Sequence, residues 1–221
     1  MRDTVEIAPS ILAADFGYLM RDIKAIEKDA EYLHIDVMDG HYVNNISFGI
    51  PVIESIRKYT DIKFYTHLMI TNPGKFIRAF ADAGSDNITF HLECAEHPES
   101  LIAEIRSYGK SVGISVHPDT PIEKVFPYIG KVDIILIMTV YPGFGGQGYL
   151  ESSYERIEKL RKAIDEQNAD TIISVDGGVT ADNIKSIYDA GARLFVAGSS
   201  VFHAEDPAKA VNDLKRCCTS S

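Results

Sequence analysis

The sequence predicts a single (β/α)8 barrel that spans residues 1–221. Three observations lead to this expectation: short β-branched segments alternate with longer amphipathic segments, the short segments number eight, and several amphipathic segments end in glycine. Strict alternation of strands and helices implies a parallel sheet, because parallel strands need long crossover connections. Eight repeats in a chain of this length favour a closed barrel over an open sheet with helices on both faces.

The predicted strands are short segments rich in β-branched residues, each followed by turn-forming or polar residues. Segments of this length and composition are typical of strands that are buried on both faces. In chain order the predicted strands are residues 6–11, 32–38, 62–69, 87–93, 111–116, 133–140, 171–178 and 193–200.

Helix-like segments separate these strands, and their apolar residues recur at spacings of three and four. They include residues 16–29, 50–59, 73–84 and 150–167, of which the last has the clearest pattern. Gly84, Gly109 and Gly191 each stand just before a predicted strand, where glycine supplies the left-handed residue that ends a helix. No segment has the composition of a linker or of a second domain.

Composition excludes several classes of function. Apolar residues make up 45% of the chain, which is enough for a full core, and the formal net charge is −10. Nucleic acids and anionic membranes are bound by basic surfaces, so neither is an expected partner. A phosphate group would have to be held locally by backbone amides rather than by the overall field of the protein.

Cysteine usage and the N-terminal segment favour a cytoplasmic location. An odd number of cysteines, with two of them adjacent, does not form a disulfide framework, so Cys94, Cys217 and Cys218 are expected to be free thiols. The first residues lack the apolar core of a signal peptide. No stretch approaches the roughly 20 apolar residues of a membrane span.

Histidine and aspartate residues fall at the carboxyl ends of three predicted strands, where barrel enzymes carry their chemistry. His34 and Asp36 are two residues apart on one strand, so both point to the same face. His67 ends the next strand and Asp176 lies on the seventh. Two imidazoles and two carboxylates form a mixed site suited to zinc, iron, manganese or cobalt. A single strand-end histidine is often only a structural residue, so the metal hypothesis rests on all four together.

Glycine-rich loops follow the last three predicted strands. They are residues 141–148, 176–179 and 198–202. Glycine allows backbone amides to approach an anion, and the amino end of a helix adds partial positive charge. Any one of these loops alone is better explained by turn geometry, but three in succession favour a phosphate site.

Met38, Met69 and Met138 stand near the polar strand ends. Methionine commonly fills gaps in a core, and it could equally form an apolar lining that keeps water from a reactive intermediate. Four further polar or aromatic residues lie nearby without an assigned role, and these are His91, Glu93, His117 and Tyr141.

The motifs APSILAADF, HIDVMDGHYV, THLM, MTVYPGFGGQ, VDGGV and VAGSSVF occur in this order. Together they closely resemble the ribulose-5-phosphate 3-epimerase family, over about residues 5–215. The resemblance implies a TIM barrel that interconverts D-ribulose 5-phosphate and D-xylulose 5-phosphate in the pentose phosphate pathway. It also implies a homo-oligomer. A related branch acts on D-allulose 6-phosphate, and Gly178 in the VDGGV motif favours the five-carbon sugar.

The resemblance also implies roles for individual residues. Asp36 and Asp176 match the two acid/base residues and, together with His34 and His67, the metal ligands. The implied cofactor is one divalent metal ion, with zinc favoured over iron, manganese or cobalt, and no organic cofactor. The positions that match the substrate-binding residues and apolar lining are Ser10, His67, Met38, Met69, Met138, Gly143, Phe144, Gly145, Gly146, Gly177, Gly178, Gly198 and Ser199.

The expected mechanism is proton transfer by two aspartates on opposite faces of an enediolate that a metal ion stabilises. Two alternatives remain open at this point. A metal-free phosphate-binding barrel enzyme typically places a lysine at a strand end, whereas Lys63 lies early in its strand. A non-catalytic sugar-phosphate-binding barrel would be expected to lose one acid/base carboxylate, and both are present.

Overall fold

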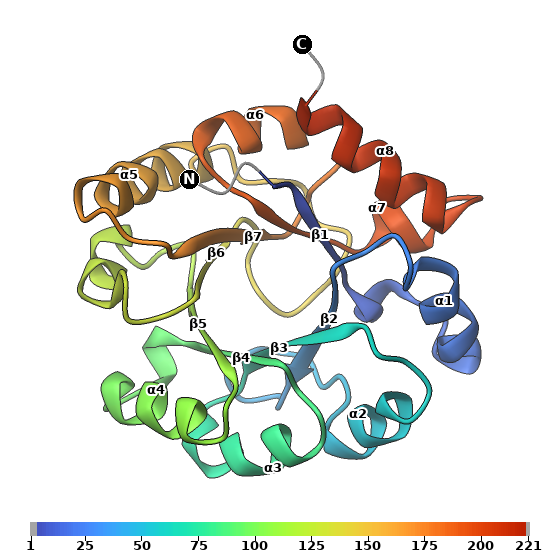
Figure 1. Cartoon of the computed structure of the whole chain (residues 1–221), viewed down its shortest axis with the longest axis horizontal. Helices are drawn as coiled ribbons and strands as arrows, with labels where there is room; N and C mark the ends of the chain where they lie inside the picture. The colour runs from blue at the N-terminus through green and yellow to red at the C-terminus, as the bar shows by residue number, and fades with distance from the viewer. Residues whose placement is uncertain (1–3, 220–221) are drawn as a thin grey trace.

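The computed structural model describes residues 4–219 and confirms the (β/α)8 barrel. Eight parallel strands form the central sheet, and helices surround it (Figure 1). All eight predicted strands are present. Their bounds are β1 (Glu6–Pro9), β2 (Tyr32–Met38), β3 (Lys63–Met69), β4 (Asn87–His91), β5 (Ser111–Val116), β6 (Ile134–Met138), β7 (Ile172–Asp176) and β8 (Leu194–Ala197).

Helices connect successive strands on the outside of the barrel. The α-helices are α1 (Leu19–Ile26), α2 (Ile50–Arg57), α3 (Ile77–Asp82), α4 (Pro98–Ser107), α5 (Ser153–Glu166), α6 (Ile184–Ala190), α7 (Ser199–Phe202) and α8 (Pro207–Thr219). Short 3-10 segments are η1 (Ile11–Ala13), η2 (Phe16–Tyr18), η3 (Pro73–Lys75), η4 (Leu92–Cys94) and η5 (Ile122–Tyr128). The connection between β5 and β6 holds only η5, whose Pro127 lacks the amide hydrogen that a continuing helix needs.

The barrel closes between its first two strands. Each strand pairs in parallel with the next one in sequence from β2 to β8, and β8 pairs with β1. A parallel bridge between Ser10 and His34 then joins the end of β1 to β2. Closure therefore brings Ser10 beside the His34–Asp36 segment, although these residues belong to different strands.

The apolar core has two layers, one inside the barrel and one between the barrel and its helices. On β6, Ile134, Leu136 and Met138 belong to the inner cluster, while Ile135 and Ile137 belong to the outer one. This alternation follows from the two-residue period of a strand. Burial of apolar surface stabilises the folded state by about 25 cal/mol per Å², so the two layers supply most of the driving force for folding.

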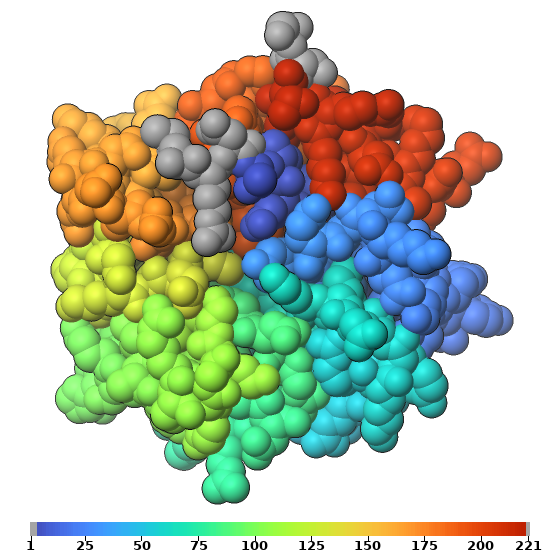
Figure 2. Space-filling model, in the orientation of Figure 1, coloured from blue at the N-terminus to red at the C-terminus, as the bar shows by residue number. Residues whose placement is uncertain are grey.

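Among residues 4–219, β1 and α1 lie beside α8, so blue and red regions adjoin in Figure 2. Lys215 on α8 donates to the Glu31 carboxylate and to the Asp29 carbonyl, and Asn212 donates to the Asp29 carboxylate. The other oxygen of Glu31 accepts from the Ile7 amide on β1. These bonds tie α8 to the turn after α1 and to the first strand.

Several predicted strands were too long at their carboxyl ends. The segments 87–93, 171–178 and 193–200 stop being strands at His91, Asp176 and Ala197, so the residues after these points belong to loops or short helices. Gly84, Gly109 and Gly191 have positive φ, as the helix-end prediction requires. Among residues 4–219 no helix has both the length and the apolar composition needed to cross a membrane.

Candidate metal centre and active site

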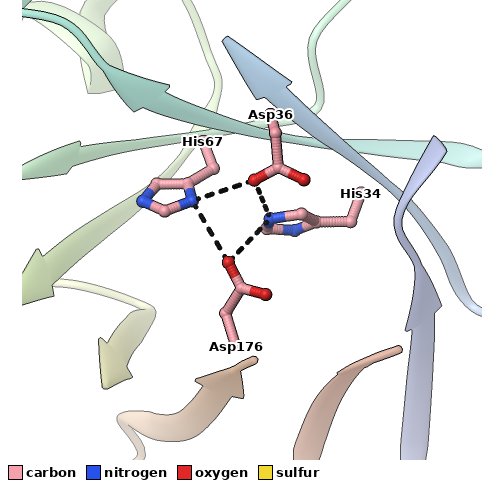
Figure 3. Close-up of side chains that lie close together, drawn as sticks. All are labelled: His34, Asp36, His67 and Asp176. Carbon is pink, nitrogen blue, oxygen red and sulfur yellow. Dashed lines mark hydrogen bonds and ion pairs between the residues drawn. The ribbon is translucent and has the colours of Figure 1, made fainter. Parts of the chain in front are cut away.

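Four side chains from three strands meet at the carboxyl end of the barrel (Figure 3). His34 and Asp36 project from the same face of β2, and the β2–β3 register sets His67 directly beside Asp36. His34 Nε2 lies 3.1 Å from Asp36 Oδ1 and 3.7 Å from Asp176 Oδ2. His67 Nδ1 lies 3.3 Å and 3.6 Å from the same two oxygens.

The cluster is buried and its charges interact strongly. Both histidines are fully buried, whereas the Asp176 side chain keeps 15% of its surface exposed. Burial lowers the pKa of His67, but its contacts with Asp176 and Asp36 outweigh burial and raise the pKa to about 9. Burial raises the pKa of Asp36, but His34 and His67 outweigh it and hold the pKa below its usual range. The pocket between the carboxylates therefore attracts positive charge.

The donor set fits a divalent transition metal. One donor atom from each of the four residues lies within 4.8 Å of the others. Bonds of about 2.0–2.2 Å from zinc to nitrogen and oxygen donors would separate neighbouring ligand atoms by roughly 3–4 Å. The histidine–carboxylate separations of 3.1–3.7 Å fall in that range. Mixed imidazole and carboxylate ligands suit zinc, iron, manganese and cobalt.

A cavity of about 390 Å³ opens above this cluster. Asp36 and Asp176 line it, while His34 and His67 lie beneath. The three methionines also line it, so they face the space above the carboxylates as well as packing in the core. The other predicted binding positions on its wall are Ser10, Gly143, Phe144, Gly145, Gly146, Gly177, Gly178, Gly198 and Ser199.

Glycine is required in the loop after β7. Gly177 has φ +116°, and a Cβ there would lie 2.3 Å from a Val140 methyl carbon. Gly178 has φ +68°, and a Cβ there would lie 2.5 Å from the Tyr149 amide nitrogen. Only glycine tolerates both the positive φ and the close approach. The loop therefore passes close to the backbone at Tyr149 while it lines the cavity.

His91 and Glu93 extend the polar cluster away from the cavity, toward β5. His91 Nε2 lies 3.0 Å from His67 Nε2, and His91 Nδ1 lies 3.3 Å from Glu93 Oε2. Burial lowers the pKa of His91 to about 4, which makes its imidazole neutral at neutral pH. The ring of His117 instead packs against Tyr141, whose hydroxyl donates to Asp119.

Comparison with known proteins identifies the family. A model described as the ribulose-phosphate 3 epimerase family matches residues 6–202. The ribulose-phosphate 3-epimerase of Mycobacterium tuberculosis is 43% identical over 210 residues, covering 95% of this chain and 91% of the relative. The Bacillus subtilis ribulose-phosphate 3-epimerase is 40% identical over 213 residues, covering 96% and 98%. The chain belongs to the ribulose-phosphate 3-epimerase family. It is therefore an isomerase, and the resemblance found in the sequence is confirmed.

More distant solved structures share the fold alone. KGPDC from Streptococcus mutans superposes with a TM-score of 0.73 at 14% identity, covering 98% of each chain. Orotidine 5'-phosphate decarboxylase from Pyrococcus horikoshii OT3 gives 0.68 at 14% identity, covering 99% and 100%. These neighbours belong to other enzyme types, so they support the barrel and not the reaction of the epimerase family.

The cavity wall includes residues for which the sequence analysis had no role. Asn183 lines the cavity, and its side chain bridges the loop after β7 by donating to the Gly178 carbonyl and accepting from the Thr180 amide. Leu12 and Gln147 also line it. Asn183 directly precedes α6, and the residue pattern there does not show that its side chain turns back to the glycine loop. His67, matched to a substrate contact, is fully buried beneath the cavity.

Proposed function

We propose that this chain catalyses the 3-epimerisation of D-ribulose 5-phosphate to D-xylulose 5-phosphate. The observation that carries the proposal is the placement of Asp36 and Asp176, which approach the same cavity from β2 and β7 (Figure 3). Inverting one carbon requires a base on one face and an acid on the other. Relatives that align with nearly the whole chain are named ribulose-phosphate 3-epimerases or, in Arabidopsis thaliana, ribulose-5-phosphate-3-epimerase, and these names support the choice of sugar and carbon.

Asp36 acts as the base when D-ribulose 5-phosphate is the substrate, and Asp176 acts as the acid. The contacts of Asp36 with two imidazoles favour its ionised form, which is the form that can accept the proton from carbon three. The pair holds one proton between them, carried by Asp176 before the reaction. Asp176, the more exposed carboxylate, delivers this proton to the opposite face, and Asp36 afterwards releases the proton that it removed to solvent. Each positioned acid or base typically contributes about 10²–10⁴-fold to the rate.

His34, Asp36, His67 and Asp176 would hold one divalent metal ion, with zinc expected ahead of iron, manganese or cobalt. Such an ion would stabilise the negative charge that develops on the substrate oxygens when the proton leaves carbon three. The two histidines are buried beneath the cavity, and their ring nitrogens face the two carboxylates. The carboxylates themselves line the cavity. No organic cofactor is needed for the proton transfers.

The glycine loops after β6, β7 and β8 bind the phosphate group. Gly177, Gly178, Gly198 and Ser199 line one part of the cavity, where backbone amides can donate to phosphate oxygens. The chain has a net charge of −10, so local amides rather than the overall field must hold the anion. The three methionines, Met38, Met69 and Met138, form the apolar lining above the carboxylates and limit access of water to the intermediate.

The test is NMR of D-ribulose 5-phosphate incubated with zinc-loaded protein in D2O. We expect D-xylulose 5-phosphate to form with deuterium at carbon three, because solvent exchanges with the acid that reprotonates the intermediate. If the protein turned over only D-allulose 6-phosphate, the two-aspartate mechanism would stand and the assigned substrate would change. No conversion of either sugar would contradict the proposal and favour a non-catalytic sugar-phosphate-binding barrel.

Assembly and location remain predictions. A homo-oligomer is tested by light scattering on the purified protein, and a cytoplasmic location is tested by cell fractionation. Small phosphorylated sugars are the only partners that we propose, and an acidic chain is not expected to bind nucleic acid or anionic membranes.

A further inference from the structure

His67 has a second ring nitrogen that points away from the candidate metal position. Its Nδ1 faces Asp36 and Asp176, whereas its Nε2 lies 3.0 Å from Nε2 of His91. The two ring centroids are 5.0 Å apart, so the imidazoles approach each other through their Nε2 edges. A neutral imidazole carries its proton on one nitrogen only. If Nδ1 of His67 holds a cation, its proton is on Nε2, and Nε2 of His91 must accept it.

The contacts on the other side of His91 agree with this direction. Its Nδ1 lies 2.8 Å from the Tyr42 hydroxyl and 3.3 Å from Glu93 Oε2. An ionised carboxylate can only accept a hydrogen bond, and a tyrosine hydroxyl can accept as well as donate, so a proton on Nδ1 of His91 satisfies both contacts. Ser115 Oγ lies 3.3 Å from the same Nε2 of His91, farther away than the 3.0 Å of His67 Nε2. Because this nitrogen has one lone pair, Ser115 competes with His67 as its donor. Hydrogen bonds then run from His67 to His91 and from His91 to Glu93.

We propose that His91 is a positioning residue that fixes His67 in the tautomer and orientation required for metal binding through Nδ1. This inference rests on the metal site of the proposed function. It assigns a role to a buried histidine that touches neither the cavity nor the candidate metal position. His34 differs, because its Nδ1 has no hydrogen-bond partner among residues 4–219. The protein therefore orients the two histidine ligands unequally.

Glu93 is itself held in place, because the chain of contacts continues to backbone groups of His117. Its Oε1 accepts from the His117 amide at 2.9 Å. The His117 carbonyl in turn accepts from Arg156 of α5 at 2.9 Å. The orientation of His67 thus depends on contacts from β4, from η4, from the residue that follows β5 and from α5. Groups that hold a ligand histidine in this way typically change metal affinity by about 10–100-fold when they are removed.

The experiment compares zinc affinity in wild-type protein, His91→Phe, His91→Gln and Glu93→Ala, measured by competition with a chromogenic chelator. His91→Phe should raise the zinc Kd about 10–100-fold, because nothing accepts the His67 proton. Glutamine can place its amide oxygen near the former Nε2 position, so His91→Gln should restore most of the affinity. Glu93→Ala should raise Kd by roughly 3–10-fold, because the acceptor for the Nδ1 proton of His91 is lost.

The matched control is His117→Gln, which removes another histidine ring from the same region. That ring contacts Tyr141 and Asp119, and the backbone amide that serves Glu93 is retained. Its zinc Kd should equal that of the wild type. Nitrogen-15 NMR of the zinc-loaded wild type gives a second readout, which should place the protons on Nε2 of His67 and on Nδ1 of His91.

The outcomes separate this inference from the proposed function. Wild-type zinc affinity in folded His91→Phe, or a proton on Nε2 of His91, would overturn the inference while leaving the metal site standing. If His91→Phe does not fold, unchanged affinity in Glu93→Ala overturns the inference instead. Wild-type protein that binds no divalent metal would overturn the metal site, and the role of His91 with it.

Discussion

Asp36 and Asp176 line one cavity but have different surroundings. Ser10 donates to Asp36 Oδ2 at 2.5 Å, and two imidazoles face Asp36 Oδ1, so both oxygens of this carboxylate have partners. Asp176 uses Oδ2 toward the histidines, and none of the hydrogen bonds within residues 4–219 involves its Oδ1. The two carboxylates are therefore suited to different steps of one reaction.

Replacing either carboxylate by its amide should abolish turnover. Asp36→Asn and Asp176→Asn should each lower kcat/KM at least 10²-fold, because an amide can neither accept the substrate proton nor return one. Steady-state kinetics on folded, zinc-saturated protein measures this loss. Asp119→Asn, which changes a carboxylate outside the cluster, is the control and should keep activity close to the wild type. Full activity in either cluster variant would contradict the two-aspartate mechanism.

The sequence predicts that His34, Asp36, His67 and Asp176 cluster, but it does not predict what surrounds them. The two-residue period of a strand is enough to set His34 and Asp36 on one face. The contact between His67 and His91 is different, because it depends on the β3–β4 register, which pairs His67 with Thr89 and sets His91 two residues further along β4. Register is set by packing across the barrel, and the residue pattern of β4 alone does not contain it.

The loop between β7 and α6 combines glycine geometry with the cavity wall. We expect Gly178→Ala to raise KM for the sugar phosphate at least tenfold. A Cβ there meets backbone atoms of Tyr149 at 2.5 Å and 2.8 Å, so the loop must move out of its binding geometry. Kinetics together with a thermal melt separates weaker binding from lost stability.

Gly49→Ala is the matched control for this loop. Gly49 has a negative φ, and a Cβ there meets nothing within 4 Å, so stability and KM should hardly change. An unchanged KM in Gly178→Ala would show that the loop can relax without loss of binding, and it would count against the phosphate site at this position.

Element boundaries show where sequence patterns lose information. Residues 171–178 continue the polar and apolar pattern of a strand, yet hydrogen bonding to the neighbouring strands ends at Asp176 because Gly177 and Gly178 turn with positive φ. Residues 16–29 carry a helical pattern throughout, but Phe16–Tyr18 form a 3-10 turn before α1 begins. Existence and order of elements follow from periodicity, whereas their ends depend on tertiary contacts.

Closure of the barrel is what assembles the site from distant parts of the chain. The Ser10–His34 bridge sets β1 beside β2, and pairing of β1 with β8 and of β8 with β7 carries Asp176 toward the same point. Eight repeats predict a closed barrel, and a closed barrel predicts convergence at one end. The convergence of these residues at one end of the barrel therefore follows from the sequence, whereas their interatomic geometry does not.

Glu93 gives a test of how the network affects the stability of the whole molecule. Burial raises its pKa, but hydrogen bonds from His91, Thr120 and the His117 amide outweigh burial and lower the pKa to about 2. Because the folded pKa lies below the unfolded value, this carboxylate adds stability above pH 4.5 that is lost as pH falls toward 2. The free energies of unfolding of the wild type and Glu93→Gln, measured in urea, should therefore become equal as pH falls over that interval. A difference independent of pH would contradict this account.

Zinc and protons compete for His67, and this competition should be visible in the stability of the whole barrel. In metal-free protein the pKa of His67 is raised from 6.5 to about 9. The stability gained from its protonated form is therefore complete below pH 6.5 and is lost as pH rises through 9. Zinc needs the unprotonated ring, so the stabilisation that it provides should grow over the same interval.

Thermal melts at buffered free zinc concentrations measure both effects. At zinc concentrations about 100-fold above Kd, binding stabilises the native state by about 2.7 kcal/mol. For a chain of this size that corresponds to a rise in Tm of about 5–10 °C. The zinc-induced rise should be larger at pH 9 than at pH 6.5 when the free zinc concentration is held constant, because fewer protons must be displaced. Equal shifts at both pH values would mean that zinc binds without displacing a proton from His67, and hence that this histidine is not a ligand.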